Sequence, residues 1–142
     1  MNGKLDHAWL LTHLPHQGAM NLLESVLAWD ATTLHARATN HAAPTHPLRR
    51  DGVLPAIAAV EYGAQAAAAH GALASGAASG DGMIASVRNV TTHVTRLDDV
   101  HGALDIRVEQ LGGGAGGVVY RFAVSAGERP LVQGRVAVAF SR

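Results

Sequence analysis

The longest apolar stretch of the chain, from Val53 to Leu73, constrains the fold more than any other feature. It is rich in alanine on every face, and Pro55 near its start suits the first turn of a helix. A helix without a polar face is stable only when other structure surrounds it. The sequence therefore predicts one buried helix of about 20 residues and about 30 Å, around which the rest of the chain is built.

Glu61 lies in the middle of this stretch. A buried charge is costly, so its carboxyl group must be paired, hydrogen-bonded or protonated. A carboxyl group in apolar surroundings has a raised pKa and can act as a general acid or base near neutral pH. We therefore expect Glu61 to be catalytic, the alternative being a side chain that caps nearby backbone. Gln65, about 40° from Glu61 around the helix, is expected to orient the carboxyl group, whereas His70 lies on the opposite side and is expected to be structural.

The flanking segments predict a short helix and several antiparallel strands. Residues 7–13 form an amphipathic pattern that ends before Pro15, and a bend is expected near Asn89. The glycine-rich run 112–117 lacks the Lys and Ser/Thr of a phosphate-binding loop, so it is expected to be a hairpin loop. Apolar or alternating patterns favour strands over residues 22–29, 33–39, 83–95, 104–110, 118–125 and 131–140.

This order of elements predicts a single α+β domain over residues 1–142 with the hotdog fold. In that fold an antiparallel sheet wraps around one long central helix, and two such units pair as a dimer. The charged fraction of only 15% also indicates that another subunit covers part of the surface.

The composition argues against several classes of function. Eleven basic and eleven acidic residues balance, so there is no electrostatic footprint for nucleic acid or for an anionic membrane. The absence of cysteine removes disulfides and thiolate chemistry, and the nine histidines lack metal-binding spacings, so no metal is expected. The N-terminus has no secretory pattern, and the long helix is too polar to span a membrane, which favours a cytoplasmic protein.

Two segments resemble the β-hydroxyacyl-acyl-carrier-protein dehydratases. Residues 14–26 are similar to the opening of that family, which reads Pro-His-Arg and then Leu-Leu-Asp-Arg-Val. Residues 60–67 are similar to its central helix, in which Glu precedes Ala-Gln-Ala-Ala by two residues. The chain resembles most closely the divergent dehydratase branch of aryl-polyene biosynthesis, which shares the Glu-Tyr-x-Ala-Gln helix and a Ser-Val-Arg strand, here residues 86–88.

The resemblance implies dehydration of a 3-hydroxyacyl thioester on an acyl carrier protein to the trans-2-enoyl thioester, without a cofactor. It implies that Glu61 is the acid and that a histidine is the base. His46 precedes Glu61 by 15 residues, one more than the family spacing, and lacks the Phe-Pro-Gly that follows the family's histidine. His16, in the better-matching segment, is the alternative base. The N–H groups of Ala56 and Ile57 at the helix start would stabilise charge on the thioester carbonyl.

In that family the base and the acid come from opposite subunits. The resemblance therefore implies a homodimer, or a heterodimer with a second hotdog subunit. Arg49 and Arg50 are candidates to meet an acidic carrier protein or its pantetheine phosphate, and a solvated loop is the alternative for them. Two other functions stay open: a hotdog acyl thioesterase that uses Glu61, and a non-catalytic hotdog subunit of a heteromeric dehydratase, which the altered segment after His46 favours.

Overall fold

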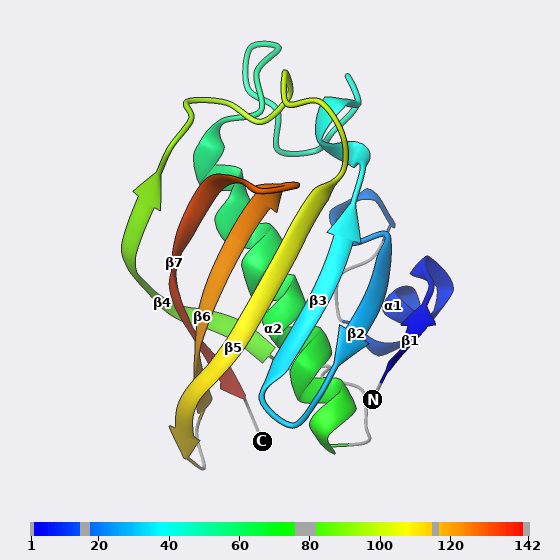
Figure 1. The fold of residues 1–142 in the computed structure, drawn as a ribbon, viewed down its shortest axis with the longest axis vertical. Coiled ribbons are helices and arrows are strands. Elements are labelled where there is room, and N and C mark those ends of the chain that lie inside the picture. The colour runs from blue at the N-terminus through cyan, green and yellow to red at the C-terminus, as the bar shows by residue number, and fades with distance from the viewer. Residues whose placement is uncertain (1, 15–17, 76–81, 115–116, 141–142) are drawn as a thin grey trace.

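The computed structural model describes residues 2–14, 18–75, 82–114 and 117–140 (Figure 1). Two α-helices, α1 and the longer α2, lie among seven strands and three short 3-10 turns in this part of the chain. The helices are α1 (His7–His13) and α2 (Ala59–Ser75), and the 3-10 turns are η1 (Gly18–Met20), η2 (Asn40–Ala42) and η3 (Ala56–Ala58). The strands are β1 (Asn2–Leu5), β2 (Ser25–Trp29), β3 (Thr33–Ala38), β4 (Gly82–Thr92), β5 (Leu104–Gly114), β6 (Gly117–Ala126) and β7 (Arg129–Phe140).

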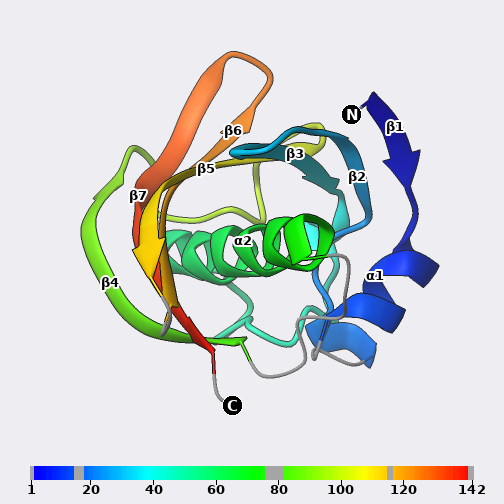
Figure 2. The same cartoon turned by 90° about the horizontal axis from the view of Figure 1, so that it is seen from below.

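The described strands form one antiparallel sheet in the order β1-β2-β3-β5-β6-β7-β4. Figure 2 shows this sheet curving around α2, which lies in its hollow. The chain crosses from α2 to the far edge of the sheet, where β4 pairs with β7 alone, and the opposite edge is β1. The order leaves β4 as an open edge strand next to the most curved part of the sheet.

Buried and exposed side chains alternate along the strands, so the sheet turns its apolar face toward α2. In β6, for example, Tyr120, Phe122 and Val124 are buried, whereas Arg121 and Ala123 between them are exposed. A strand presents successive side chains to opposite faces, so the inner face forms the core with the helix and the outer face carries the polar residues. The apolar helix is thus enclosed by apolar strand faces, as its sequence predicts.

The helix and the sheet are in close contact at Gly63. A Cβ atom at this position would lie 2.6 Å from Cγ of Phe122, which is fully buried on β6. Real Cβ contacts are not this short, so glycine is required here by the approach of the sheet. The small residues of α2 therefore let the chain's own sheet pack tightly against the helix.

His70 joins the C-terminal half of α2 to strand β6 and to the turn between β2 and β3. Its Nε2–H donates to the carbonyl of Asp30 at 3.0 Å, and its Nδ1 accepts from the Tyr120 hydroxyl at 2.8 Å. Burial raises the pKa of Tyr120 to about 12, so the phenol keeps the proton that it donates. His70 is 1% exposed, and the expectation that it is structural is confirmed.

Most of the expected elements are confirmed, including α1 over residues 7–13 and the hairpin of β2 and β3. The predicted bend near Asn89 is also confirmed, because Asn89 has a positive φ of 55° and the register of β4 shifts between Arg88 and Thr91. Three differences stand out. The α-helix begins at Ala59, after the 3-10 turn η3 that follows Pro55, and has 17 residues rather than about 20. Strand β1 was not expected, and Gly112 to Gly114 belong to β5 because they pair with β6 rather than forming a loop.

Candidate functional site

Glu61 occupies the first turn of α2 and is half-buried. Every residue from Tyr62 to His70 is buried, so Glu61 is where the helix comes nearest to solvent before its enclosed part begins. The 3-10 turn η3 continues directly into this turn, because the Ala59 N–H donates to carbonyl groups of η3. Glu61 is therefore a partly accessible carboxyl group at one end of the central helix.

Gln65 fixes the surroundings of Glu61. Its Oε1 accepts from the Leu22 N–H at 2.8 Å, and its Nε2 donates to the Met20 carbonyl at 2.7 Å. The same Nε2 lies 3.4 Å from Oε1 of Glu61. Gln65 is fully buried, so its amide is held rigidly between the helix and residues 20–22. The predicted proximity of Gln65 to Glu61 is confirmed.

His46 belongs to a buried chain of hydrogen bonds. Its Nδ1 accepts from the Leu48 N–H at 3.1 Å, which places the ring proton on Nε2. That N–H donates to the Tyr62 hydroxyl at 2.9 Å, and the hydroxyl donates to Oδ1 of Asn40 at 2.6 Å. Both ring nitrogens are therefore engaged, and the described hydrogen bonds include none between His46 and Glu61.

Burial and nearby charges keep the groups in this chain of hydrogen bonds neutral. Burial, followed by the nearby Arg49 and His41, lowers the pKa of His46, and burial raises the pKa of Tyr62. A neutral imidazole and a protonated phenol are the forms that the hydrogen bonds require. The roles of Tyr62 and Asn40 were not predicted, because their contact joins residues 22 positions apart. The one sequence signal was that Tyr62 is a polar aromatic residue within an apolar helix.

The remaining predicted site residues have different positions. The Ala56 N–H donates to the carbonyl of Thr95 at 3.1 Å, so in this arrangement it is not available to a substrate carbonyl. Ile57 is 57% exposed in the 3-10 turn that precedes α2, and its part in binding stays a prediction. His16 lies outside the described residues.

The segment before α2 is anchored by Asp98. Its Oδ1 accepts from the Leu54 N–H at 2.9 Å, and its carboxylate pairs closely with the guanidinium of Arg96. The hydrogen bond from Arg96 is the main reason that the pKa of Asp98 is well below its usual range. Arg49 also belongs to this structure, because it donates to the carbonyls of Ala42, Ala43 and Gly52. Arg49 therefore holds the loop together, while Arg50 is exposed.

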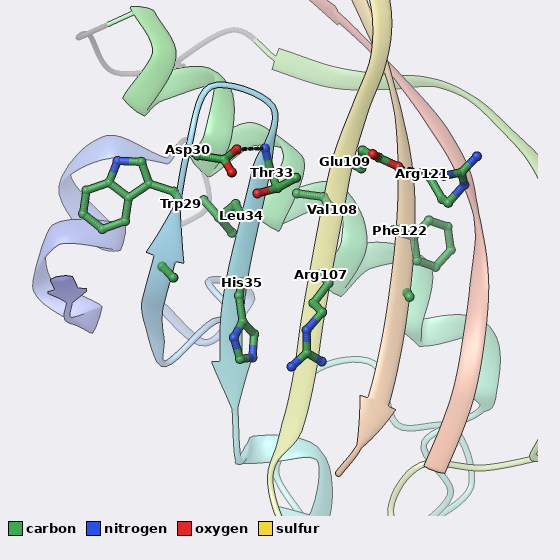
Figure 3. A pocket seen from close by; sticks show the side chains of 12 residues that line it. Trp29, Asp30, Thr33, Leu34, His35, Arg107, Val108, Glu109, Arg121 and Phe122 are labelled. Carbon is green, nitrogen blue, oxygen red and sulfur yellow. Dashed lines mark hydrogen bonds and ion pairs between the residues drawn. The ribbon is translucent and has the colours of Figure 1, made fainter. Parts of the chain in front are cut away.

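A hollow lies beside these residues, and a larger one lies away from them. A cavity of about 320 Å³ lies between α1 and the loop that carries His46, and Asn40, Thr45 and His7 also line it. An open groove of about 480 Å³ lies on the outer face of the sheet, where Figure 3 shows Arg107 and Arg121 on neighbouring strands. Glu61 lines neither. Among the described residues, no three histidine or acidic side chains gather closely enough to hold a metal ion.

A seven-stranded sheet around one central helix, with a supported carboxylate at the start of that helix, defines a hotdog protein of the dehydratase and thioesterase type. Within that class, the family model of the ApeP dehydratases matches residues 10–141, and the chain belongs to this ApeP-like family. A comparison with curated protein sequences found no match. No helix among the described residues has the length and apolar character needed to cross a bilayer.

Solved structures place the fold in the same class. The dehydratase heterocomplex ApeI:P from Xenorhabdus doucetiae is 26% identical with a TM-score of 0.82, over 94% of this chain and 91% of that one. AziG from S. sahachiroi is 17% identical with a TM-score of 0.62, over 84% of this chain and 91% of that one. Zebrafish thioesterase superfamily member 2 is 13% identical with a TM-score of 0.61, over 87% and 84%. The last two similarities show the fold alone.

Proposed function

We propose that this dehydratase acts on a 3-hydroxyacyl thioester and produces the trans-2-enoyl thioester, with the acyl group carried on the phosphopantetheine of an acyl carrier protein. The observation that carries the proposal is the pair of Glu61 and Gln65 in a member of a dehydratase family. The carboxyl group is accessible, and a buried amide fixes the backbone beside it. Such rigid support is what a proton-transfer group needs.

The reaction removes a proton from C2 and expels the C3 hydroxyl group as water. Glu61, when protonated, gives its proton to the leaving hydroxyl group, and a histidine accepts the C2 proton. His46 and His16 are the candidates for this base. Because the lone pair of His46 is engaged by the Leu48 N–H, His46 acts as a base only after that hydrogen bond opens.

A second hotdog chain completes the site in this proposal. The ApeI:P relative is a heterocomplex, and here β4 is an open edge on which Val87 is 41% exposed. Edge strands offer unpaired N–H and C=O groups to another strand. A partner that covers Glu61 would also remove its carboxyl group from water, and this would favour the protonated form that the mechanism needs.

One observation favours a second candidate, a non-catalytic subunit. In the described chain both nitrogens of His46 serve the bonds to Leu48 and Tyr62, as expected of a structural histidine. In that case the partner chain supplies both the base and the acid, and this chain contributes only the shape of the site.

The test is mass spectrometry of a 3-hydroxyacyl carrier protein incubated with the chain, alone and with a second hotdog subunit. We expect a product lighter by one water and still attached to its carrier. Glu61→Gln should abolish this product while the fold persists, because glutamine keeps the volume and hydrogen bonds of the side chain. Glu128→Gln, in the exposed β6–β7 turn, is the matched control.

Three outcomes would count against the proposal. Free carrier thiol without loss of water would indicate a thioesterase. Undiminished turnover by Glu61→Gln would remove Glu61 from the mechanism. An unchanged substrate with and without the partner would contradict the dehydration itself, whereas turnover only with the partner and insensitive to Glu61→Gln would establish the non-catalytic subunit.

A further inference from the structure

The register of the sheet places three arginines side by side on its outer face. Arg88 of β4 is the direct neighbour of Arg135 on β7, and Arg135 is the direct neighbour of Arg121 on β6. All three are exposed. Directly opposed like charges on neighbouring strands destabilise a sheet by a few tenths of a kcal/mol or more, so this arginine row (Arg88, Arg135 and Arg121) has an energetic cost that the fold does not require.

Little within the chain offsets this charge. Arg121 pairs with Glu109 of β5 at 2.7 Å, and both side chains are about half exposed, so the pair adds little stability. Among the residues that the structure describes, no carboxylate pairs with Arg88 or Arg135. The carboxylates of the outer face, Asp105 and Glu109, both lie on β5, so the half of the sheet formed by β6, β7 and β4 is positive.

The arginine row also borders an apolar strip. On β6, Val119 is 38% exposed and faces Ala137 of β7, and Leu111 of β5 is 40% exposed. On the other side lies the open groove, which Arg107 of β5 lines (Figure 3). Arg107 is diagonal to Arg121 in the register, because Arg107 pairs with Ala123 and Arg121 pairs with Glu109. A line of guanidinium groups beside exposed aliphatic side chains is typical of a surface that meets another protein.

We propose that the arginine row is a docking surface for an acidic helix of a partner protein. Neighbouring strands are about 4.8 Å apart, so the row spans about 10 Å. Carboxylates on successive turns of a helix are about 5.4 Å apart, and three of them span nearly the same length. Arginine binds carboxylates through paired hydrogen bonds, so three such contacts fix both the position and the direction of the helix.

The chemistry of the outer sheet face favours an acidic protein over nucleic acid or an anionic membrane as the partner. Nucleic-acid surfaces combine basic groups with aromatic side chains that stack on bases, and the arginine row has no aromatic neighbour on its own face. The formal net charge of the chain is zero, so the positive charge of this face is local and the whole chain has no long-range attraction for a membrane or a phosphate backbone. A narrow charged row with an aliphatic border matches an amphipathic acidic helix.

This surface deepens the proposed function in one respect: the acidic partner is the carrier protein that delivers the acyl thioester. Arg49, a candidate for that contact from the sequence, has its guanidinium group engaged by loop carbonyls. Arg88 and Arg135 present theirs to solvent. The docking surface is therefore placed on the sheet rather than on the loop before α2.

The first measurement is binding. Fluorescence anisotropy of a labelled acyl carrier protein without acyl group is followed as the full chain is added, at low and at raised salt. The double variant Arg88→Glu/Arg135→Glu should weaken binding about tenfold or more and should flatten its salt dependence. The single variant Arg135→Glu should also weaken binding, whereas Arg129→Glu, which makes the same two-unit charge change at the start of the same strand β7, should stay within about twofold of the parent chain.

Folding of the variants has its own readout. Arg135→Glu places a carboxylate between Arg88 and Arg121, so its melting temperature should stay the same or rise while carrier binding falls. A loss of binding that accompanied a lower melting temperature in this variant would indicate damage to the sheet and would overturn the proposal.

A kinetic measurement separates docking from chemistry. With a carrier-bound 3-hydroxyacyl substrate, the double variant should raise KM and keep kcat. With the same acyl group on N-acetylcysteamine, kcat/KM should not change. Turnover of both substrates with an unchanged carrier KM would overturn the docking surface and leave the proposed function standing.

The opposite combination of results, carrier binding without turnover, tests the proposed function separately. Carrier binding that depends on the arginine row, without dehydration of either substrate, would leave the docking surface standing and reject the proposed function. Carrier binding that is insensitive to the double variant, or that is lost only in Arg50→Glu, would overturn the docking surface.

Discussion

Among single residues, His46 shows how a buried side chain can be fixed in one protonation state. The Leu48 N–H and the Tyr62 hydroxyl together specify the Nε2–H tautomer, and Asn40 orients that hydroxyl. A proton added to Nδ1 would face the Leu48 N–H and lose a hydrogen bond. The neutral ring is thus part of the packing of α2 against the loop before it.

This arrangement predicts a dependence of stability on pH. The pKa of His46 is lowered in the folded chain, so below the unfolded value of about 6.5 the unfolded state binds the additional proton. Its stabilising contribution is fully present above that pH. It declines toward lower pH by up to about 1.4 kcal/mol per pH unit, until the folded pKa is reached. Urea unfolding of the parent chain and of His46→Gln between pH 5 and 8 measures this contribution to the free energy of unfolding.

The difference between the two proteins isolates His46 from the other histidines. His46→Gln should lose less stability on acidification than the parent chain does, because glutamine has no proton to gain. Equal slopes in the two proteins would show that His46 keeps its ordinary pKa.

The sequence identifies some of these residues and misses others for a physical reason. Glu61 and Gln65 stand out because polar groups four positions apart on an apolar helix share one face. The partners of His46 do not stand out, because Asn40 and Tyr62 meet only when the loop folds over the helix. The Ala56 N–H is a similar case. The sequence predicts that it binds a substrate carbonyl, but in the folded chain it donates to the carbonyl of Thr95.

Among the elements, α2 and β6 pack closely against each other where Gly63 meets Phe122. Gly63→Ala should destabilise the chain by about 1–3 kcal/mol, because the added methyl group meets the ring and Cβ of Phe122. The higher helix propensity of alanine recovers at most about 1 kcal/mol. Thermal or urea unfolding measures the net loss.

A double-mutant cycle locates the cause of this effect. Combined with Phe122→Leu, which removes the ring from the contact, Gly63→Ala should cost much less than it does alone. An unchanged cost would show that the glycine is required by its backbone rather than by the approach of β6.

Elements were predictable where the local pattern agrees with the tertiary environment. Alternation in β3 and β6 and the continuous apolar helix are examples. Strand β1 has a weak local pattern and exists through its pairing with β2, where Leu5 is opposite Val26. Gly112 and Gly113 have low strand propensity, yet pairing with β6 extends β5 through them. Non-local pairing decided both cases.

For the whole molecule, the open edge at β4 predicts assembly. We expect multi-angle light scattering to give the mass of two hotdog chains, for this chain alone or mixed with a second hotdog subunit. Val87→Lys should shift the complex toward monomer, because a charge at an edge strand opposes further pairing. Val119→Lys, an equally exposed valine on the interior strand β6, should leave the mass unchanged.

Either of two results would contradict this assignment. A monomer under every condition would remove the dimer, and equal effects of the two lysines would place the interface elsewhere than β4. In the proposed function the measurement also bears on catalysis, because a second chain that covered the half-buried Glu61 would enclose its carboxyl group.

The Gly63–Phe122 contact has a consequence for where an acyl chain can lie. Glu61 and Gly63 are about 200° apart around α2, so the carboxyl group and the Gly63–Phe122 contact are on opposite sides of the helix. No room for a hydrocarbon tail exists between helix and sheet at a position where a single methyl group does not fit. In the proposed function, a tail whose head group reaches Glu61 is therefore expected to run along the side of the helix away from Phe122. Its preferred length would then depend on the surface that lines that side, so we expect that exchanging a partner chain there changes the preferred substrate without altering this sheet.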